Sequence, residues 1–215
     1  MKKYKLLKDE FIEKHNKRLY RIVKIDTDEK GGFIESENNL SQNGDAWVSN
    51  SAVVFGDARV SNSAVVSDDA VVFGNARVSN SAVVSGDARV FSNAEVSSNA
   101  WVSGDAVVSG NAKVSGDAVV SGNAWVSDDA VVSDDARVSN SAVVSGDAWV
   151  SGDAVVSGNA RVSGNGVVSG GAVVSDDAVV FGNARVFGNA RVFGNARVSG
   201  NAKIKSTTDY IVYGP

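Results

Sequence analysis

The feature that most constrains this chain is a six-residue repeat that runs unbroken through most of its length. Alanine occupies every sixth position from 46 to 202, apart from Gly166, which gives 27 hexads. The residue two places after each of these positions is always Val, except Ile204 at the end. A unit this short cannot bury a hydrophobic face alone, so we expect a solenoid whose repeats stack on one another.

Each hexad is expected to form a short strand followed by a corner. Ala and the following Val are two residues apart, so they point to the same side of a strand while the residue between them points outward. The next three positions are mostly Ser, Gly, Asn and Asp. Gly, Asn and Asp tolerate the left-handed backbone of a sharp corner. The small Ala beside each Val predicts a narrow interior without a lumen.

Phenylalanine indicates how many hexads make one coil. Phe55, Phe73 and Phe91 follow the hexad Val in every third hexad, and Phe181 lies five such steps further on. Three hexads per step predict a triangular coil of eighteen residues and about nine coils in all. Phe55, Phe73 and Phe91 should then form an aromatic stack at one corner, with rings ~4.8 Å apart.

The hexads resemble those of the hexapeptide-repeat left-handed β-helix superfamily, which contains many acyltransferases. The run Val-Ser-Gly-Asp-Ala-Val matches its pattern of aliphatic, small and variable positions. A narrower resemblance is to a group of bacterial and phage proteins that are often labelled transferases. It rests on residues 31–41, which read Gly-Gly-Phe-Ile-Glu-Ser-Glu-Asn-Asn-Leu-Ser. The resemblance implies an all-β fold, a single-stranded left-handed parallel β-helix, and it is the source of the expected handedness.

We expect three segments: a small β-rich cap over residues 1–40, the β-helix over 41–205, and a tail over 206–215. A cap is needed because an open solenoid end exposes unpaired strand edges. Residues 11–12 and 19–25 have strand character, with a turn over 15–18 between them. A short helix containing Leu6, Leu7, Phe11 and Ile12 is the alternative. The tail resembles the start of a C-terminal cap, and two interpretations of it stay open: a cap that this protein lacks, or a cap that has been shortened.

The outward residues predict an interaction surface. Sorted by coil, two of the three faces are largely apolar, which suits self-association or a protein partner. The simpler interpretation is that Val and Trp favour strands. The third face is basic at both ends, but acidic corners flank it, so a nucleic-acid partner is not expected. The surface predicted from the apolar faces comprises Trp47, Val65, Val83, Trp101, Val119, Val53, Val71, Val107 and Trp125.

Catalytic chemistry is not expected. Hexapeptide acyltransferases, as a family, use a histidine base and loops that leave the coil, whereas the one histidine here, His15, precedes the repeats and no loop interrupts them. A general base must lie within hydrogen-bond reach of the reacting group. The sequence therefore predicts no catalytic residue, no cofactor and no small-molecule substrate.

Metal binding has one set of candidates. Asp117, Asp135 and Asp153 occupy the same corner position in successive coils, where a Ca²⁺ ion would relieve their repulsion. Solvated turn carboxylates are the simpler interpretation, so no metal site is predicted. The chain has no Cys, which excludes thiolate ligands and disulfides.

These observations favour a non-catalytic structural or interaction protein, of phage or prophage type, whose rigid prism self-associates or binds a protein partner through its Val/Trp faces. Two alternatives remain open: an acyltransferase-like enzyme with its site at a subunit interface, and an inhibitor of a host defence protein. No segment reaches the ~18 apolar residues of a membrane span. The first residues lack the apolar region of a signal peptide, so the expected location is the cytoplasm.

Overall fold

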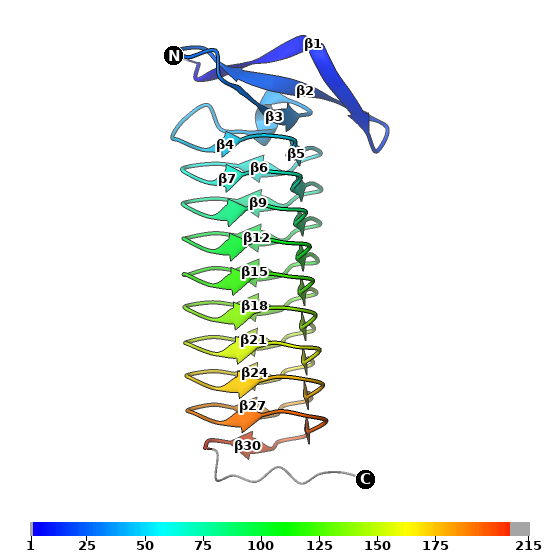
Figure 1. Ribbon diagram of the computed structural model, residues 1–215, viewed down its shortest axis with the longest axis vertical. Coiled ribbons are helices and arrows are strands. Elements are labelled where there is room, and N and C mark those ends of the chain that lie inside the picture. Colours follow the sequence, from blue (N-terminus) through cyan, green and yellow to red (C-terminus); the bar gives the residue numbers. More distant parts are fainter. Residues whose placement is uncertain (1, 207–215) are drawn as a thin grey trace.

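Stacked coils form a straight prism that a hairpin covers at its N-terminal end (Figure 1). The structure is a computed structural model and describes residues 2–206. Strands three hexads apart pair in parallel, as Val65 does with Val83, so each coil holds three hexads. The prediction of an all-β, left-handed parallel β-helix with triangular coils of three hexads is confirmed. The predicted tail lies outside the described residues except for its first residue.

Three sheets form the sides of the prism. The first sheet contains β4 (Trp47–Val48), β7 (Val65–Val66), β10 (Val83–Val84), β13 (Trp101–Val102), β16 (Val119–Val120), β19 (Arg137–Val138), β22 (Val155–Val156), β25 (Val173–Val174) and β28 (Arg191–Val192). The second contains β5 (Val53–Val54), β8 (Val71–Val72), β11 (Arg89–Val90), β14 (Val107–Val108), β17 (Trp125–Val126), β20 (Val143–Val144), β23 (Arg161–Val162), β26 (Val179–Val180) and β29 (Arg197–Val198). The third contains β6 (Arg59–Val60), β9 (Arg77–Val78), β12 (Glu95–Val96), β15 (Lys113–Val114), β18 (Val131–Val132), β21 (Trp149–Val150), β24 (Val167–Val168), β27 (Arg185–Val186) and β30 (Lys203–Ile204).

The interior is a ladder of Ala and Val side chains. Ala118 and Val120 of a middle coil are fully buried, and the same holds for their equivalents in the coils above and below. Backbone bonds join the coils, for example from Val119 N to Ala136 O at 2.9 Å. Each buried Val stabilises the fold by roughly 1.5–3 kcal/mol. Because this gain needs a neighbour on both sides, stability depends on the stack rather than on any one coil.

The corners turn through a left-handed residue. Every sixth residue from Asn50 to Gly200 has a positive φ. At Gly116 φ is +71°, and an added Cβ would lie 2.6 Å from the backbone nitrogen of Asp134 in the next coil. Glycine is favoured here for two reasons, the sign of φ and the close approach of neighbouring coils.

The N-terminal cap is a β-hairpin, as predicted, and not a helix. Strand β1 (Tyr4–Lys14) pairs antiparallel with β2 (Lys17–Lys24), and the register shifts between Leu7 and Phe11, where β1 bends. His15 and Asn16 form the two-residue turn with φ values of 52° and 59°. Positive φ at both turn residues matches the right-handed twist of the paired strands.

The first coil joins this cap to the repeats and differs from the coils below it. Strand β3 (Lys30–Ile34) pairs antiparallel with β2 on one edge and parallel with β5 on the other. Phe33 pairs with Val53 and Leu40 pairs with Val60, so the paired residues are 20 apart in the sequence here and not 18. The two extra residues lie in the corner after Leu40, because Trp47 already pairs with Val65, 18 residues on. A 3₁₀ turn, η1 (Glu37–Asn39), precedes that corner. Below this first coil, the described residues contribute nine strands of the repeats to each side of the prism, which corresponds to nine coils. The predicted segment boundaries stay predictions.

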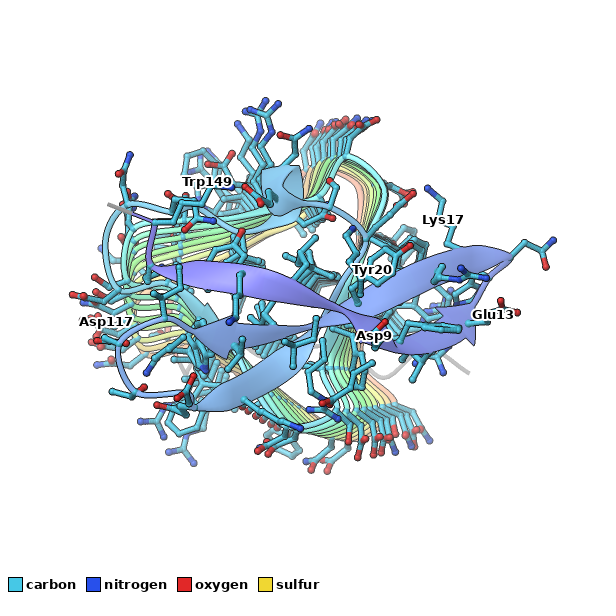
Figure 2. All side chains as sticks on the ribbon, turned by 90° about the horizontal axis from the view of Figure 1, so that it is seen from above. Asp9, Glu13, Lys17, Tyr20, Asp117 and Trp149 are labelled. Carbon is cyan, nitrogen blue, oxygen red and sulfur yellow. The ribbon has the colours of Figure 1, made fainter. Side chains whose placement is uncertain are left out.

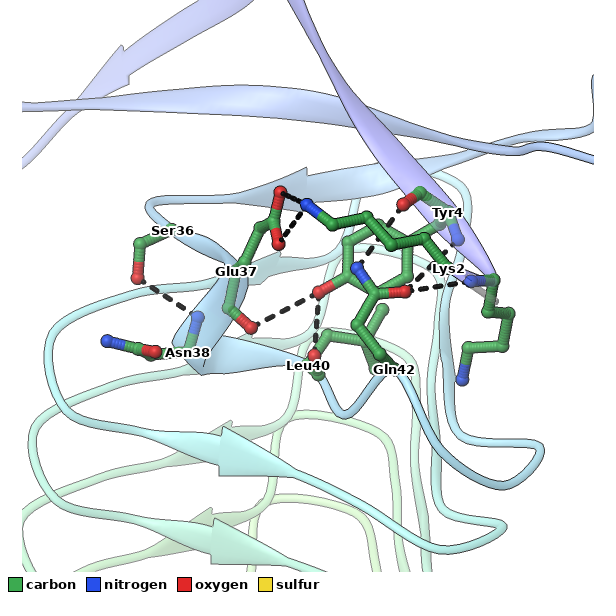
Figure 3. A network of polar contacts seen from close by, with 8 residues as sticks. Lys2, Tyr4, Ser36, Glu37, Asn38, Leu40 and Gln42 are labelled. Atoms are coloured by element: carbon green, nitrogen blue, oxygen red, sulfur yellow. Dashed lines mark hydrogen bonds and ion pairs between the residues drawn. The ribbon is translucent and has the colours of Figure 1, made fainter.

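A buried tyrosine fastens β1 to this first coil (Figure 3). Tyr4 is fully buried, and its hydroxyl donates to the carbonyl oxygen of Leu40 at 2.6 Å, with Glu37 O 3.2 Å away. Burial, and secondarily the charge of Glu37, raises the pKa of Tyr4 far above its ordinary value. Gln42 adds to the junction by accepting from Lys3 N and donating to Tyr4 O. The cap is therefore fixed to the solenoid by specific bonds.

Candidate functional site

Outward side chains of the three sheets form the candidate site, and they divide into patches rather than continuous strips. On the first sheet Val65, Val83, Trp101 and Val119 follow one another in register, and Arg137 ends the run. We call these four residues the Trp101 patch. Trp101 is 51% exposed, and its three Val neighbours are half-buried. This is the longest exposed apolar run among the described outward positions.

The other two sheets carry shorter patches of the same kind. On the second sheet Trp125 lies between Val107 and Val143. On the third, Trp149 lies between Val131 and Val167 and points away from the prism (Figure 2). Trp101, Trp125 and Trp149 are spaced by four hexads, which is one coil plus one face. The repeat thus places one exposed Trp with Val above and below it on each face.

Two of the indole rings are held against the preceding coil. Trp101 Nε1 donates to Ser85 Oγ at 3.2 Å, and Trp149 Nε1 donates to Ser133 Oγ at 3.4 Å. The polar edge of each ring is therefore satisfied, and the apolar ring surface faces solvent. A side chain fixed in this way loses little conformational entropy when a partner covers it.

Three residues of the predicted interaction surface are not on the surface, which corrects that prediction. Trp47, Val53 and Val71 are 8%, 1% and 7% exposed, because the cap covers the first coils. Trp47 packs against the ring of Tyr4, with centroids 6.4 Å apart, and Lys24 Nζ lies 4.9 Å from its ring centre. The hexads of these coils are the same as those further on, so the repeat carries no signal of this burial. The six other predicted residues stay available.

The phenylalanine corner forms a ring stack that the hairpin extends. Phe55 and Phe73 lie 5.1 Å apart with planes 6° apart, and Phe73 and Phe91 lie 4.9 Å apart at 10°. His15, at the tip of the hairpin, stacks on Phe55 with centroids 5.3 Å apart. The one histidine is therefore a packing residue of the cap. Its ring also stacks near Phe73, with centroids 6.0 Å apart.

Some of the corner carboxylates accept hydrogen bonds from an Asn of the neighbouring coil. Asp117 Oδ1 accepts from Asn99 Nδ2 at 2.8 Å, and it points outward at a corner of the prism (Figure 2). Within residues 2–206, no three His, Cys, Asp or Glu side chains converge to hold a metal ion, and this includes Asp117, Asp135 and Asp153. Other corner carboxylates bind the next coil instead, as Asp134 Oδ2 does by accepting from Gly152 N at 3.1 Å.

The remaining perturbed groups lie in the cap. Burial, opposed by the charge of Asp45, lowers the pKa of Lys3, whose Nζ donates to Ala46 O at 2.7 Å. Partial burial of Glu35 disfavours its ionised form, but hydrogen bonds from Lys17 and from Gly56 N outweigh this and hold its pKa below the ordinary value. Both groups fasten the hairpin to the first coils. Neither has the geometry of an acid or base that faces a substrate.

Comparison with known proteins agrees with the geometry. Seven segments match the model of the YdcK beta-solenoid repeat: residues 54–68, 70–86, 112–128, 130–146, 156–170, 184–200 and 190–203. These segments lie within the hexads, and the match fits the hexapeptide-repeat β-helix superfamily that the sequence resembles. No curated protein matches the sequence.

Solved structures that are similar to this chain include enzymes. The chain is 20% identical to the acetyltransferase domain of PglB from Neisseria gonorrhoeae in complex with acetyl coenzyme A, with a TM-score of 0.44. That match covers 57% of this chain and 56% of the PglB domain, so the chain spans just over half of that structure. UDP-N-acetylglucosamine acyltransferase from Francisella novicida is 16% identical, with a TM-score of 0.29 and coverage of 68% and 62%.

These structures correct one prediction. We inferred from the uninterrupted repeat that the chain is not an enzyme, and that inference is wrong, because solved structures similar to this solenoid are acyltransferases. At these identities and TM-scores the similarity assigns no reaction to this chain. Among residues 2–206, no helix is long and apolar enough to cross a membrane. The cytoplasmic location and the phage origin stay predictions.

Proposed function

We propose that the protein is an interaction module that associates with a second copy of itself through the Trp101 patch. The exposure of Trp101 between half-buried valines carries this proposal. An exposed Trp in an apolar setting is the residue most typical of an interface hot spot. The indole is already held by its bond to Ser85, so association would not have to order it.

The chemistry around the patch supports a copy of the chain as the partner. A flat side built from identical hexads has low relief, and two flat surfaces of one kind fit each other about a two-fold axis. Four apolar outward residues in register span three inter-strand steps, roughly 14 Å. The Arg137 side chain that ends the run would lie at the rim of such an interface, where charge sets orientation more than affinity.

Single tryptophan substitutions test the proposal. Trp101→Lys should convert the associated form to monomer in light scattering, while Trp149→Lys should leave it intact. Trp149 is the matched control because its exposure of 52% and its indole bond to a serine are nearly the same, but it lies on another sheet. Equal effects of both substitutions, or a wild-type protein that is monomeric at every concentration, would overturn the proposal.

The acyltransferase alternative makes a further demand that can be measured. A site at a subunit interface would bind an acyl-coenzyme A only in the associated form. Acetyl coenzyme A should then give heat on titration into the wild-type protein and none into Trp101→Lys. Heat of equal size with both proteins argues for a site within one chain, and no heat with either argues against this alternative.

A further inference from the structure

Two arginines lie side by side on the third sheet, directly below the first coil. Arg59 and Arg77 point outward from β6 and β9 in register, so their backbones are one inter-strand step apart, ~4.8 Å. Both side chains are exposed, and neither forms an ion pair within the described chain. Like charges directly opposite each other on neighbouring strands destabilise a sheet. An anion between the two guanidinium groups would remove that penalty.

The first coil leaves a hollow beside this pair. At the level above Arg59, the side chain of Asn39 turns into the protein and donates to Gly56 O and Ala58 O, both at 2.9 Å. Asn39 is fully buried, so the outward column begins only at Arg59. The hollow has a volume of about 320 Å³, within the usual range for a small-molecule site.

Neutral donors line the same hollow. Its polar lining comprises Asn38, Ser41, Arg59, Ser61, Arg77 and Ser79. The amide of Asn38, the middle residue of η1, and the hydroxyls of Ser61 and Ser79 have no side-chain hydrogen-bond partner among residues 2–206. Figure 3 shows Asn38 with its amide directed away from the cap network. Charged and neutral donors therefore converge from two coils and from the 3₁₀ turn.

No carboxylate of the described residues forms an ion pair with Arg59 or Arg77. Glu95 stands in register with Arg77 on the far side from Arg59, but no ion pair forms between them. Glu37 of the 3₁₀ turn is paired with Lys2 at 2.8 Å, and Asp57 is exposed on the corner that precedes Arg59. The corner after the pair has no acid: its Asn62 donates to Asn80 at 2.9 Å.

We propose that this hollow binds the phosphate group of a small phosphate ester. A phosphate monoester carries about −1.5 to −2 charges near pH 7 and three strong acceptor oxygens, which suits two cations and several neutral donors. Arginine is the side chain best suited to bind such a group through paired N–H donors. A carboxylate has one charge and two oxygens, and it would leave one guanidinium unneutralised. This site is independent of association through the Trp101 patch, which lies on another sheet.

Calorimetric titration with glycerol 3-phosphate and with inorganic phosphate tests the proposal. Wild-type protein should bind both, and Arg59→Gln and Arg77→Gln should each weaken binding at least about tenfold, since each removes charge-assisted bonds to the anion. Arg89→Gln is the matched control. It removes the same charge from an outward position whose strand neighbours are Val71 and Val107, and it should bind as the wild type does.

Three outcomes would overturn the assignment. These are no binding to wild-type protein, equal weakening by Arg89→Gln, and equally tight binding of acetate, which would make the hollow a general anion site. Circular dichroism of each variant checks the fold. Because Arg59 and Arg77 are exposed and form no ion pair within the described chain, the substitutions should leave the spectrum unchanged.

Discussion

Restoring the missing alanine at position 166 should stabilise the protein. Gly166 is the one departure from Ala in the hexad series, it is buried, and its backbone nitrogen donates to Ser163 O at 3.2 Å. The equivalent bond of Ala160, in the preceding hexad, is 3.3 Å long. The backbone at Gly166 therefore already has the conformation that Ala adopts elsewhere. An added Cβ would lie 3.0 Å from Ser163 O and 3.3 Å from Val180 O, close contacts that a small shift can relieve.

The expected gain follows from two contributions. Burying one methyl group is worth about 0.8 kcal/mol. Replacing Gly by Ala also restricts the unfolded chain, which adds about 0.4–1 kcal/mol. Allowing for the close contact, Gly166→Ala should raise the free energy of unfolding by about 1 kcal/mol and the melting temperature by about 2–4 °C.

Thermal and urea unfolding followed by circular dichroism measure this effect. Ala160→Gly is the reciprocal control and should lower the midpoint by a similar amount. A lower midpoint for Gly166→Ala would refute the reasoning, because it would mean that neighbouring hexads are not structurally equivalent. An unchanged midpoint for both variants would show that this inner position does not contribute through burial.

Three further predictions concern the ring stack, the cap and the corners. Phe73→Ala should cost about 1–3 kcal/mol in chemical denaturation, more than Phe91→Ala, because Phe73 has stacked rings on both sides and Phe91 stacks on one. Stability should fall as pH rises above about 10, because the pKa of Tyr4 is raised in the folded protein and only the tyrosine of the unfolded chain ionises at that pH. Thermal melts over a pH series measure this loss, and Tyr4→Phe should reduce it. Gly116→Ala should destabilise by more than the about 1–2 kcal/mol expected for Gly200→Ala. Both glycines have positive φ, but of the two only Gly116 has another coil of residues 2–206 within 4 Å of an added Cβ, and equal losses would contradict this.

The sequence was sufficient to predict the solenoid because the repeat constrains every level of the fold. The phenylalanine spacing gave three hexads per coil, and the parallel register has that spacing throughout the repeats. The cap was predicted as β-rich from its strand-forming residues and from the need to cover an open end. What it covers could not be predicted, because Val53 and Val71 occupy the same hexad context as valines that are only half-buried further along the chain.

The candidate site was predicted only in part. The apolar outward residues were found, but they were grouped into long strips, whereas arginines divide each face into patches. The four-hexad spacing of Trp101, Trp125 and Trp149 was a visible signal of one tryptophan patch on each face. The hollow beside Arg59 had no such signal, because it depends on the inward turn of Asn39 in a non-repetitive segment.

The molar mass in solution tests the central claim most directly. Light scattering coupled to size exclusion should give a multiple of the 22.2 kDa chain mass for the wild-type protein and 22.2 kDa for Trp101→Lys. Trp149→Lys should elute with the wild-type mass. A wild-type mass of 22.2 kDa at all concentrations, or an assembly that survives Trp101→Lys, would contradict association through the Trp101 patch.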